Sequence, residues 1–298
     1  MSLHAPAPEP LADRPDGTVV RHGPLVLKTH APDSDPTALA TRIGIAAHPL
    51  LSGILLPPLP TPDGAAPAHP GRPLSAWPYG TPVAPDDPDA APWAETAALL
   101  ARLHRTDPAA LPAGLPPMRG PAKAARAVAR MRAAAPDAPR AVLQAWHGLP
   151  AWARDETGPA RPRTALCHGD LHLGQLVRHP APDGPWHLID VDDLGLGDPA
   201  WDLARPAAWY AAGLLHPDDW QRFLAAYRAA GGPAVRPEGD PWPELDVAAR
   251  ALTVQTAALA LAKSAAEARP LDEVEQLMID SCARIASLPP EEDAAPPP

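Results

Sequence analysis

Proline sets where helices can form in this chain, because a proline inside a helix removes a backbone hydrogen bond and collides with the preceding turn. The 298-residue sequence contains 46 prolines, which concentrate at its two ends and in connecting segments. Long stretches rich in alanine and leucine are free of them. Hydrophobic residues make up 46% of the chain, which is enough for a core. The pattern predicts a globular protein whose helices are joined by rigid, proline-rich loops.

A short β-rich part is followed by a longer helical part. Residues 17–30 predict two strands around a turn, and Asp35 before Pro36 predicts the start of a short helix. Two β runs near residues 175–179 and 186–190 predict a hairpin within the helical part. Apolar residues at helical spacing predict helices over residues 93–107, 122–135, 140–154, 216–232, 245–268 and 271–288.

Together these elements predict an α+β fold with two lobes, a small β-rich N-terminal lobe and a larger helical C-terminal lobe. We expect the first lobe over residues 17–81 and the second over residues 82–288. Residues 1–16 are expected to form a loose arm, and residues 289–298 a disordered tail. The aromatic stripe that begins at Trp220 is expected to lie in the core.

Charge and composition narrow the possible functions. The formal net charge is −10, which argues against a nucleic-acid-binding surface because such a surface is basic. The first residues lack the apolar core of a signal peptide, and proline interrupts the apolar run "LLSGILLPPLP". The only two cysteines, Cys167 and Cys282, have no metal-binding spacing. We therefore expect a cytoplasmic protein that does not interact with a membrane.

The stretch "ALCHGDLHLGQLV", residues 165–177, concentrates polar residues between two apolar runs. Asp170 is followed five residues later by Gln175, and twenty residues after Asp170 comes Asp190, at the end of a predicted strand. Phosphoryl transfer needs a carboxylate that orients the attacking hydroxyl and accepts its proton. It also needs oxygen ligands for the magnesium that neutralises the phosphates. The order of these three residues matches that requirement.

These segments resemble the aminoglycoside phosphotransferase family, within the broader protein-kinase-like fold. "HGDLHLGQ" looks like the family's catalytic loop, "LIDVDD" its metal-binding segment, and "GDPAWDLA" the sequence that follows it. "RHGPLVLK" resembles the strand that carries a phosphate-binding lysine, "WPYGTPV" the hinge between the lobes, and "ALLARLH" the first large-lobe helix. The glutamine in place of the usual asparagine resembles maltokinase-like relatives.

The resemblance implies a role for each matching residue. Asp170 would be the catalytic base, and Gln175 and Asp190 would be magnesium ligands. Lys28 would contact the phosphates of ATP or GTP, whose base would lie near the hinge at residues 77–80. His168 would support the loop from beneath, with His172 also structural, and Asp202 would reach back to hold the loop. The resemblance thus implies a nucleoside triphosphate and a small hydroxyl-bearing acceptor as partners.

Structural alternatives remain open for several of these residues. Asp170 could cap a turn, Gln175 could bond across the loop, and Asp190 could lie in a surface turn. Asp202 could be an exposed first-turn residue, with Asp198 capping the same helix. Asp192 and Asp193 could extend a magnesium site or face solvent. The basic helix from Lys123 to Arg132 is expected to be a solvated face.

Two other functions remain possible. The spacing of His168, Asp170 and His172 allows a metal-dependent hydrolase, although Gly169 and Gly174 argue against the helix that such a pair of histidines needs. No glutamate lies between Thr29 and Pro60 to pair with Lys28, and no glycine-rich loop precedes it. These departures allow a pseudokinase-like binding module without turnover.

The acceptor is expected on the helical side, after residue 205. Five acidic residues there would suit an aminated acceptor such as an aminoglycoside or amino sugar, and the alternative is an ordinary acidic surface: Asp218, Asp219, Glu244, Asp246 and Glu267.

Overall fold

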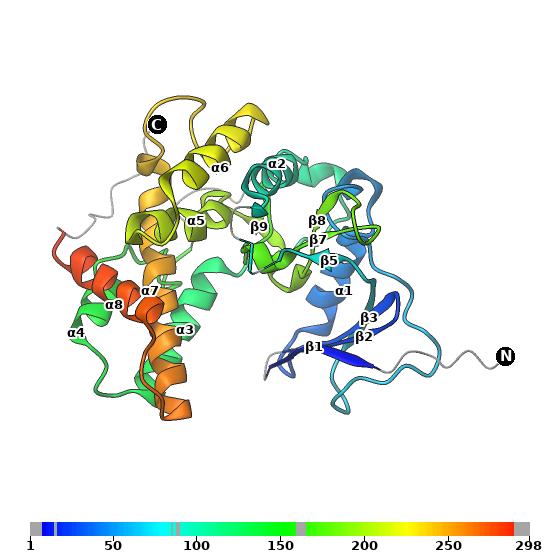
Figure 1. The fold of residues 1–298 in the computed structure, drawn as a ribbon, viewed down its shortest axis with the longest axis horizontal. Helices are drawn as coiled ribbons and strands as arrows, with labels where there is room; N and C mark the ends of the chain where they lie inside the picture. The colour runs from blue at the N-terminus through cyan, green and yellow to red at the C-terminus, as the bar shows by residue number, and fades with distance from the viewer. Residues whose placement is uncertain (1–7, 15–16, 85, 88–89, 159–164, 289–298) are drawn as a thin grey trace.

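A computed structural model describes residues 8–14, 17–84, 86–87, 90–158 and 165–288 of the chain. It contains a β-rich N-terminal part and a larger helical part, as the sequence predicts (Figure 1). The strands of the N-terminal part lie at the lower right of Figure 1, and the long helix α7 runs through the helical part at the left.

The N-terminal part is built on an antiparallel sheet in the order β1-β2-β3-β4. Its strands are β1 (Glu9–Arg14), β2 (Gly17–His22), β3 (Leu25–Thr29) and β4 (Leu74–Pro78), and the crossover from β3 to β4 contains α1 (Pro36–Ala46) and a 3₁₀ turn, η1 (Pro49–Leu51). Asp35 caps α1 as predicted, because its carboxylate accepts hydrogen bonds from the backbone N–H groups of Thr37 and Ala38.

One expectation for this part is wrong. Residues 9–14 of the predicted loose arm form the edge strand β1, which pairs with β2 through five residue pairs. The sequence of β1 lacks the alternation of apolar and polar residues that marks a strand, because β1 is almost entirely exposed and has no apolar face. Residues 1–7 and 15–16 of the predicted arm lie outside the described residues, and so does the predicted tail. Residue 8 is described and belongs to no strand.

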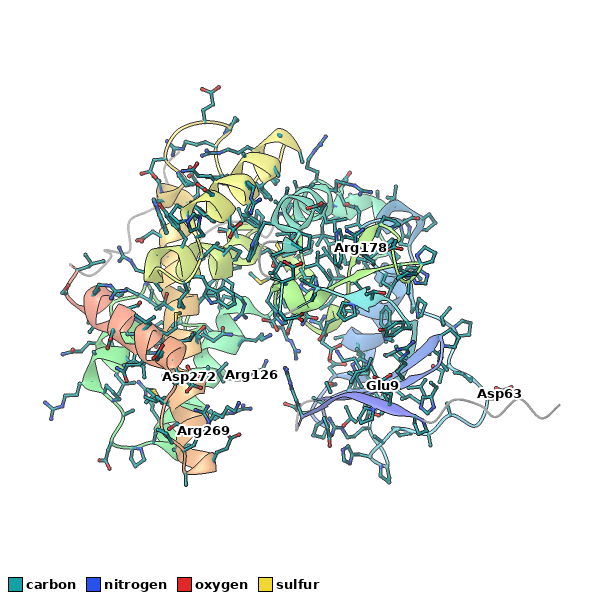
Figure 2. The ribbon with its side chains drawn as sticks, in the orientation of Figure 1. Glu9, Asp63, Arg126, Arg178, Arg269 and Asp272 are labelled. Atoms are coloured by element: carbon teal, nitrogen blue, oxygen red, sulfur yellow. The ribbon has the colours of Figure 1, made fainter. Side chains whose placement is uncertain are left out.

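The rest of the chain contains two small β units. In one, β5 (Thr81–Pro82) pairs with β7 (Leu176–Arg178), which pairs with β8 (Trp186–Leu188). Figure 2 labels Arg178 of this hairpin, whose guanidinium lies 4.4 Å from the ring centroid of Trp186. In the other, β6 (Ala165–Cys167) pairs with β9 (Gly195–Gly197). These two units hold the segments before and after the "HGDLHLGQ" loop.

The helices of this part pack mainly against one another. They are α2 (Trp93–His104), α3 (Gly120–Ala134), α4 (Arg140–His147), α5 (Ala200–Ala212), α6 (Pro217–Ala229), α7 (Trp242–Glu267) and α8 (Glu273–Ala286), with 3₁₀ turns η3 (Pro108–Ala110), η4 (Leu173–Gln175) and η5 (Val191–Asp193). The predicted helix over 140–154 ends at His147, because Gly148 and Pro150 follow. Figure 2 labels Arg269 and Asp272 at the turn between α7 and α8, where Asp272 forms a capping box with Glu275.

The aromatic stripe of α6 lies in the core as predicted. Trp220, Phe223 and Tyr227 are buried, and Trp220 stacks on Tyr210 of α5 with ring centroids 5.5 Å apart. Among the described helices, α7 alone is long and apolar enough to cross a bilayer by length and composition. However, 72% of its most apolar stretch is buried inside the protein, as in the core helix of a globular fold.

Arg42 joins the N-terminal helix to the catalytic region. Its buried guanidinium donates from Nε to the carbonyl of Leu194 over 2.7 Å and from Nη2 to the carbonyl of Pro117 over 3.3 Å. Both acceptors flank β9, so α1 is tied to the strand that pairs with the start of the predicted catalytic loop.

Substituting Gly195 tests how tightly β9 is packed. A Cβ at this position would lie 2.4 Å from the carbonyl oxygen of Pro116 and 2.6 Å from the backbone nitrogen of Met118. Because these are backbone atoms, Gly195→Ala is expected to lower the free energy of unfolding by about 1–3 kcal/mol in urea denaturation.

Gly44 provides the matched control, since it lies exposed in α1 and a Cβ there meets nothing within 4 Å. Gly44→Ala is expected to raise the free energy of unfolding by about 0.5–1 kcal/mol. Equal effects of the two substitutions would contradict the tight packing of β9.

Candidate active site

The loop from His168 to Leu173 is shaped by a close approach of two backbones. Gly169 has a φ of +86°, which favours glycine, and a Cβ there would lie 2.4 Å from the carbonyl oxygen of Asp193. Asp170 follows directly, so this glycine sets the path of the chain on which the predicted catalytic carboxylate is carried.

A buried carboxylate holds this loop from below. The Asp202 side chain accepts hydrogen bonds from the backbone N–H of His168 at 2.6 Å and of Gly169 at 2.7 Å. Asp202 is 1% exposed, and it is placed by the first turn of α5. Burial favours the neutral acid, yet the hydrogen bonds from His104 and Gly169 keep the pKa of Asp202 below its usual value. Asp202 therefore reaches back to the loop in the way that the resemblance implied.

Asp202 is itself held by a chain of hydrogen bonds from the core. Nε2 of His104 in α2 lies 2.9 Å from its Oδ2, and Nδ1 of His104 lies 2.7 Å from the hydroxyl of Tyr227 in α6. The backbone N–H of Ala234 donates to that hydroxyl over 3.0 Å. Because a carboxylate only accepts, Nε2 of His104 carries the proton and Tyr227 can donate to Nδ1. The loop is thus connected to two core helices.

Two cations contact Asp170. Nη2 of Arg205 lies 2.9 Å from its Oδ1, and Nζ of Lys123 lies 2.8 Å from its Oδ2. Burial disfavours the charged carboxylate, but Lys123 and Arg205 outweigh it and lower the pKa of Asp170 to about 2. Asp170 is therefore ionised at neutral pH, which suits a group that accepts a hydrogen bond from a hydroxyl.

Lys123 also contacts Asp193, which is buried. Its Nζ lies 2.6 Å from Oδ2 of Asp193, and Nε of Arg119 lies 2.5 Å from Oδ1 of the same carboxylate. The expectation that the helix from Lys123 to Arg132 is a solvated face is therefore wrong at its first residue. Lys123 is spaced three residues after Gly120 and four before Ala127, both buried, so it lies beside the packed face of α3.

A second cluster forms around Asp190. Nζ of Lys28 in β3 lies 2.6 Å from Oδ1 of Asp190, and Nε2 of Gln175 donates to Oδ2 over 3.3 Å. Asp190 has a φ of 64°, a conformation that is uncommon for residues other than glycine. Burial alone would raise its pKa, but Lys28 lowers it well below the usual value. The structure thus brings Lys28, Gln175 and Asp190 together.

Asp192 pairs with Lys28, for which the sequence between Thr29 and Pro60 offers no glutamate. Its Oδ2 lies 3.1 Å from Nζ of Lys28, and its carboxylate lies 3.0 Å from Nδ1 of His30. His30 is fully buried, and its Nε2 lies 2.7 Å from the hydroxyl of Ser75 in β4. Lys28 and Asp192 therefore form an ion pair that connects the N-terminal sheet to the segment after β8.

The two histidines of the loop have structural positions. His168 is buried, and its Nε2 donates to the carbonyl of Ile189 over 2.7 Å. Nδ1 of His172 accepts from the N–H of Gly174 over 3.1 Å, and burial lowers the pKa of His172 to about 4.

Neither histidine joins a group of three metal-binding side chains among the described residues. The one such group is His104, Cys167 and Asp202. The ring nitrogens of His104 and the carboxylate of Asp202 already take part in the core hydrogen bonds, and burial raises the pKa of the Cys167 thiol. The structure gives the hydrolase alternative no support.

The Asp190 cluster does fit magnesium. Magnesium prefers hard oxygen ligands and is usually bound by one or two carboxylates together with substrate phosphates. Asp190 and Asp192 provide carboxylates, the amide of Gln175 adjoins them, and the ammonium of Lys28 shows that the site already stabilises a cation.

A family comparison agrees with this arrangement. The model of the phosphotransferase enzyme family, APH, matches residues 16–246, which include both clusters. The chain belongs to this family. It is therefore a phosphotransferase, as its resemblance to the aminoglycoside phosphotransferases implied. No curated protein matches the chain significantly.

Solved structures share the fold of this phosphotransferase. A spectinomycin phosphotransferase in complex with ADP and spectinomycin is 12% identical, with a TM-score of 0.59 over 95% of this chain and 92% of that chain. A choline kinase from Cryptosporidium parvum is 9% identical, with a TM-score of 0.60 over 94% and 88%. An aminoglycoside 2'-phosphotransferase variant in its GDP complex is 16% identical, with a TM-score of 0.54 over 96% and 91%. The fold is the two-lobed, kinase-like α+β fold that the sequence predicts.

Several residues of the two clusters were missed from the sequence. Arg205 is the only basic residue in the largely apolar helix α5, and that isolation was a usable signal. His104 lies on the same face of its helix as Trp93, Ala97, Leu100 and Leu103, and that apolar spacing gives no sign of a partner such as Asp202. His30 lies two residues beyond Lys28, directly after β3, but nothing in the sequence pairs it with Asp192.

A cavity of about 120 Å³ lies away from both clusters. Trp152, Asp198, Trp201 and Glu244 are among its lining residues, whereas Asp170 and Lys28 are not. It adjoins Gly197, which pairs with Ala165 at the end of the β6–β9 ribbon remote from the loop.

Removing the Tyr227 hydroxyl tests the hydrogen-bond chain to Asp202. Tyr227→Phe leaves a buried backbone N–H and a buried histidine nitrogen without their partner, so the free energy of unfolding should fall by about 1–3 kcal/mol. The measurement is urea denaturation of both proteins. Tyr210→Phe is the control, because the Tyr210 hydroxyl makes no hydrogen bond within the described residues, and it should change stability by less than about 0.5 kcal/mol.

Replacing Lys28 tests the cation site at Asp190. Lys28→Met leaves two neighbouring carboxylates without their shared cation, so the melting temperature should fall in metal-free buffer. Added magnesium should then raise the melting temperature of Lys28→Met more than that of the native protein, because the ion supplies the missing charge. Lys263→Met, which removes an exposed lysine, is the control. A magnesium shift no larger in Lys28→Met than in this control would be evidence against the site.

Proposed function

We propose that this phosphotransferase moves the γ-phosphoryl group of ATP or GTP to a hydroxyl of a small polar molecule, with magnesium held by Asp190 and Gln175. The observation that carries the proposal is the ionised Asp170 carboxylate on a loop fixed by Asp202, beside the cation-holding group of Lys28, Gln175 and Asp190. The acidic balance of the chain supports a small-molecule substrate rather than nucleic acid, and a cytoplasmic location without a membrane partner is part of the same proposal.

In this mechanism each residue acts on one part of the reaction. Asp170 accepts a hydrogen bond from the acceptor hydroxyl, orients it toward the phosphorus and takes its proton late in the transfer. Lys28 exchanges its contact with Asp190 for the nucleotide phosphates. Magnesium, when bound, neutralises charge on the phosphate oxygens. His168 and Asp202 contribute by fixing the loop rather than by touching substrate.

The choice of nucleotide and acceptor is part of the proposal. Related folds are known with ADP and with GDP, so both ATP and GTP are candidates. The base of the nucleotide would lie beside residues 77–80. The acids beyond residue 205 are largely neutralised: Asp219, Glu244, Asp246 and Glu267 each pair with an arginine. This pairing favours an ordinary surface over a site built for a polycation, so neutral hydroxyl compounds are candidates along with aminoglycosides and amino sugars.

The proposal is tested by magnesium-dependent nucleotide consumption with a panel of aminoglycosides, amino sugars and neutral polyols. We expect one class of acceptor to stimulate consumption when magnesium is present. If nucleotide raises the melting temperature but no acceptor gives turnover, the protein is a binding module. If there is neither turnover nor a melting shift, the nucleotide-dependent function is wrong.

Asp170→Asn tests the proposed base directly. Loss of the proton acceptor should lower kcat by about 100-fold or more, while nucleotide affinity stays nearly unchanged. Circular dichroism should show an intact fold, because Lys123 keeps Asp193 and Arg205 keeps the carbonyl of Leu171 as partners. Asp137→Asn, at an exposed residue between α3 and α4, should retain full activity. Full activity in Asp170→Asn would assign the base elsewhere.

A further inference from the structure

Lys123 is a cation that the two carboxylates it contacts do not require for neutralisation. Asp193 has Arg119 as a partner, and Asp170 has Arg205. Lys123 contacts both carboxylates, so three cations face two anions at this point of the molecule. Burial alone would lower the pKa of Lys123, but Asp193 and Asp170 raise it, so the amine is protonated. The group therefore carries one positive charge in excess.

The excess charge faces the reaction site rather than the core. The side chains of Lys123 and Asp170 are 22% and 23% exposed, whereas that of Asp193 is 9% exposed. Lys123 lies in the first turn of α3, and α3 begins near the centre of the molecule beside β9 (Figure 1). His172 adds no positive charge at neutral pH, because burial lowers its pKa to about 4.

We propose that Lys123 is a catalytic residue that contacts the phosphoryl group during transfer. The inference rests on the proposed function. A hydroxyl that hydrogen-bonds to Asp170 lies about 2.6–3.2 Å from that carboxylate, and the phosphorus approaches it to about 3–3.5 Å. Nζ of Lys123 lies 2.8 Å from the same carboxylate, so the incoming phosphoryl oxygens come within reach of its N–H donors.

Lys123 stabilises negative charge on the phosphoryl oxygens and takes no part in the bond changes of the transfer. The acceptor oxygen forms a bond to the γ-phosphorus as the bond from phosphorus to the bridging oxygen breaks. The nucleoside diphosphate leaves with that electron pair, and the hydroxyl proton passes to Asp170. Lys123 keeps its own proton throughout, turning from Asp170 toward the phosphoryl oxygens while Asp193 holds the ammonium in place.

The experiment compares binding of magnesium-ADP alone with binding of magnesium-ADP plus aluminium fluoride, which imitates a phosphoryl group in transfer. Titration calorimetry is performed on the native protein, Lys123→Met, Lys123→Arg and the control Arg130→Met. Arg130 is an exposed residue of the same helix, about two turns beyond Lys123. Lys123→Met should fold, because each carboxylate keeps its own arginine.

The native protein and Arg130→Met should bind ADP more tightly when aluminium fluoride is present. Lys123→Met should lose about 100-fold of that tightening while its affinity for magnesium-ADP alone changes less than about twofold. Lys123→Arg, which keeps the charge, should retain most of the tightening.

Three results would overturn the inference. These are equal tightening in Lys123→Met and Arg130→Met, an equal loss in Lys123→Arg and Lys123→Met, or no tightening in a native protein that binds magnesium-ADP. A native protein that does not bind magnesium-ADP at all would instead refute the proposed function on which the inference rests.

Discussion

The hydrogen bonds from the backbone of His168 and Gly169 to the buried carboxylate of Asp202 are the interaction on which the candidate site depends. Such a carboxylate is tolerated in a core only when its acceptor sites are filled, and here His104 supplies a further donor. Since Tyr227 and Ala234 extend the chain of hydrogen bonds into α6 and beyond, the loop is oriented by the packed core. The position of Asp170 is therefore set by residues far from it in sequence.

The segment "DVDD" after β8 carries carboxylates that pair with side chains of both lobes. Asp190 and Asp192 face Lys28 and His30 of the N-terminal sheet, while the next residue, Asp193, faces Arg119 and Lys123 on the helical side. The left-handed conformation of Asp190 and the 3₁₀ turn that follows it allow these neighbouring carboxylates to point to different parts of the protein. One short turn thus joins the nucleotide side and the acceptor side of the proposed reaction.

The sequence predicted what depends on local pattern. Turn chemistry and periodicity account for both hairpins, the cap of α1 by Asp35 and the aromatic core of α6. The family motif predicted that Lys28, Gln175 and Asp190 would lie in one site. What it could not predict are pairings between residues 70 and 162 positions apart, namely Lys123 with Asp193 and His30 with Asp192. A charged residue on an alanine-rich helix has the same local pattern whether it meets solvent or a carboxylate. What decides between them is where α3 begins, and this is set by the pairing of Pro117 and Met118 with Leu196 of β9.

The central claim is that the two clusters together transfer a phosphoryl group to a hydroxyl. Phosphorus NMR of the native protein with magnesium, nucleoside triphosphate and the acceptor panel measures this most directly. The account predicts a new phosphomonoester resonance that grows as the γ-phosphate resonance declines, with nucleoside diphosphate formed in equal amount. An unchanged nucleotide spectrum, or release of inorganic phosphate with no ester at any acceptor, would contradict it.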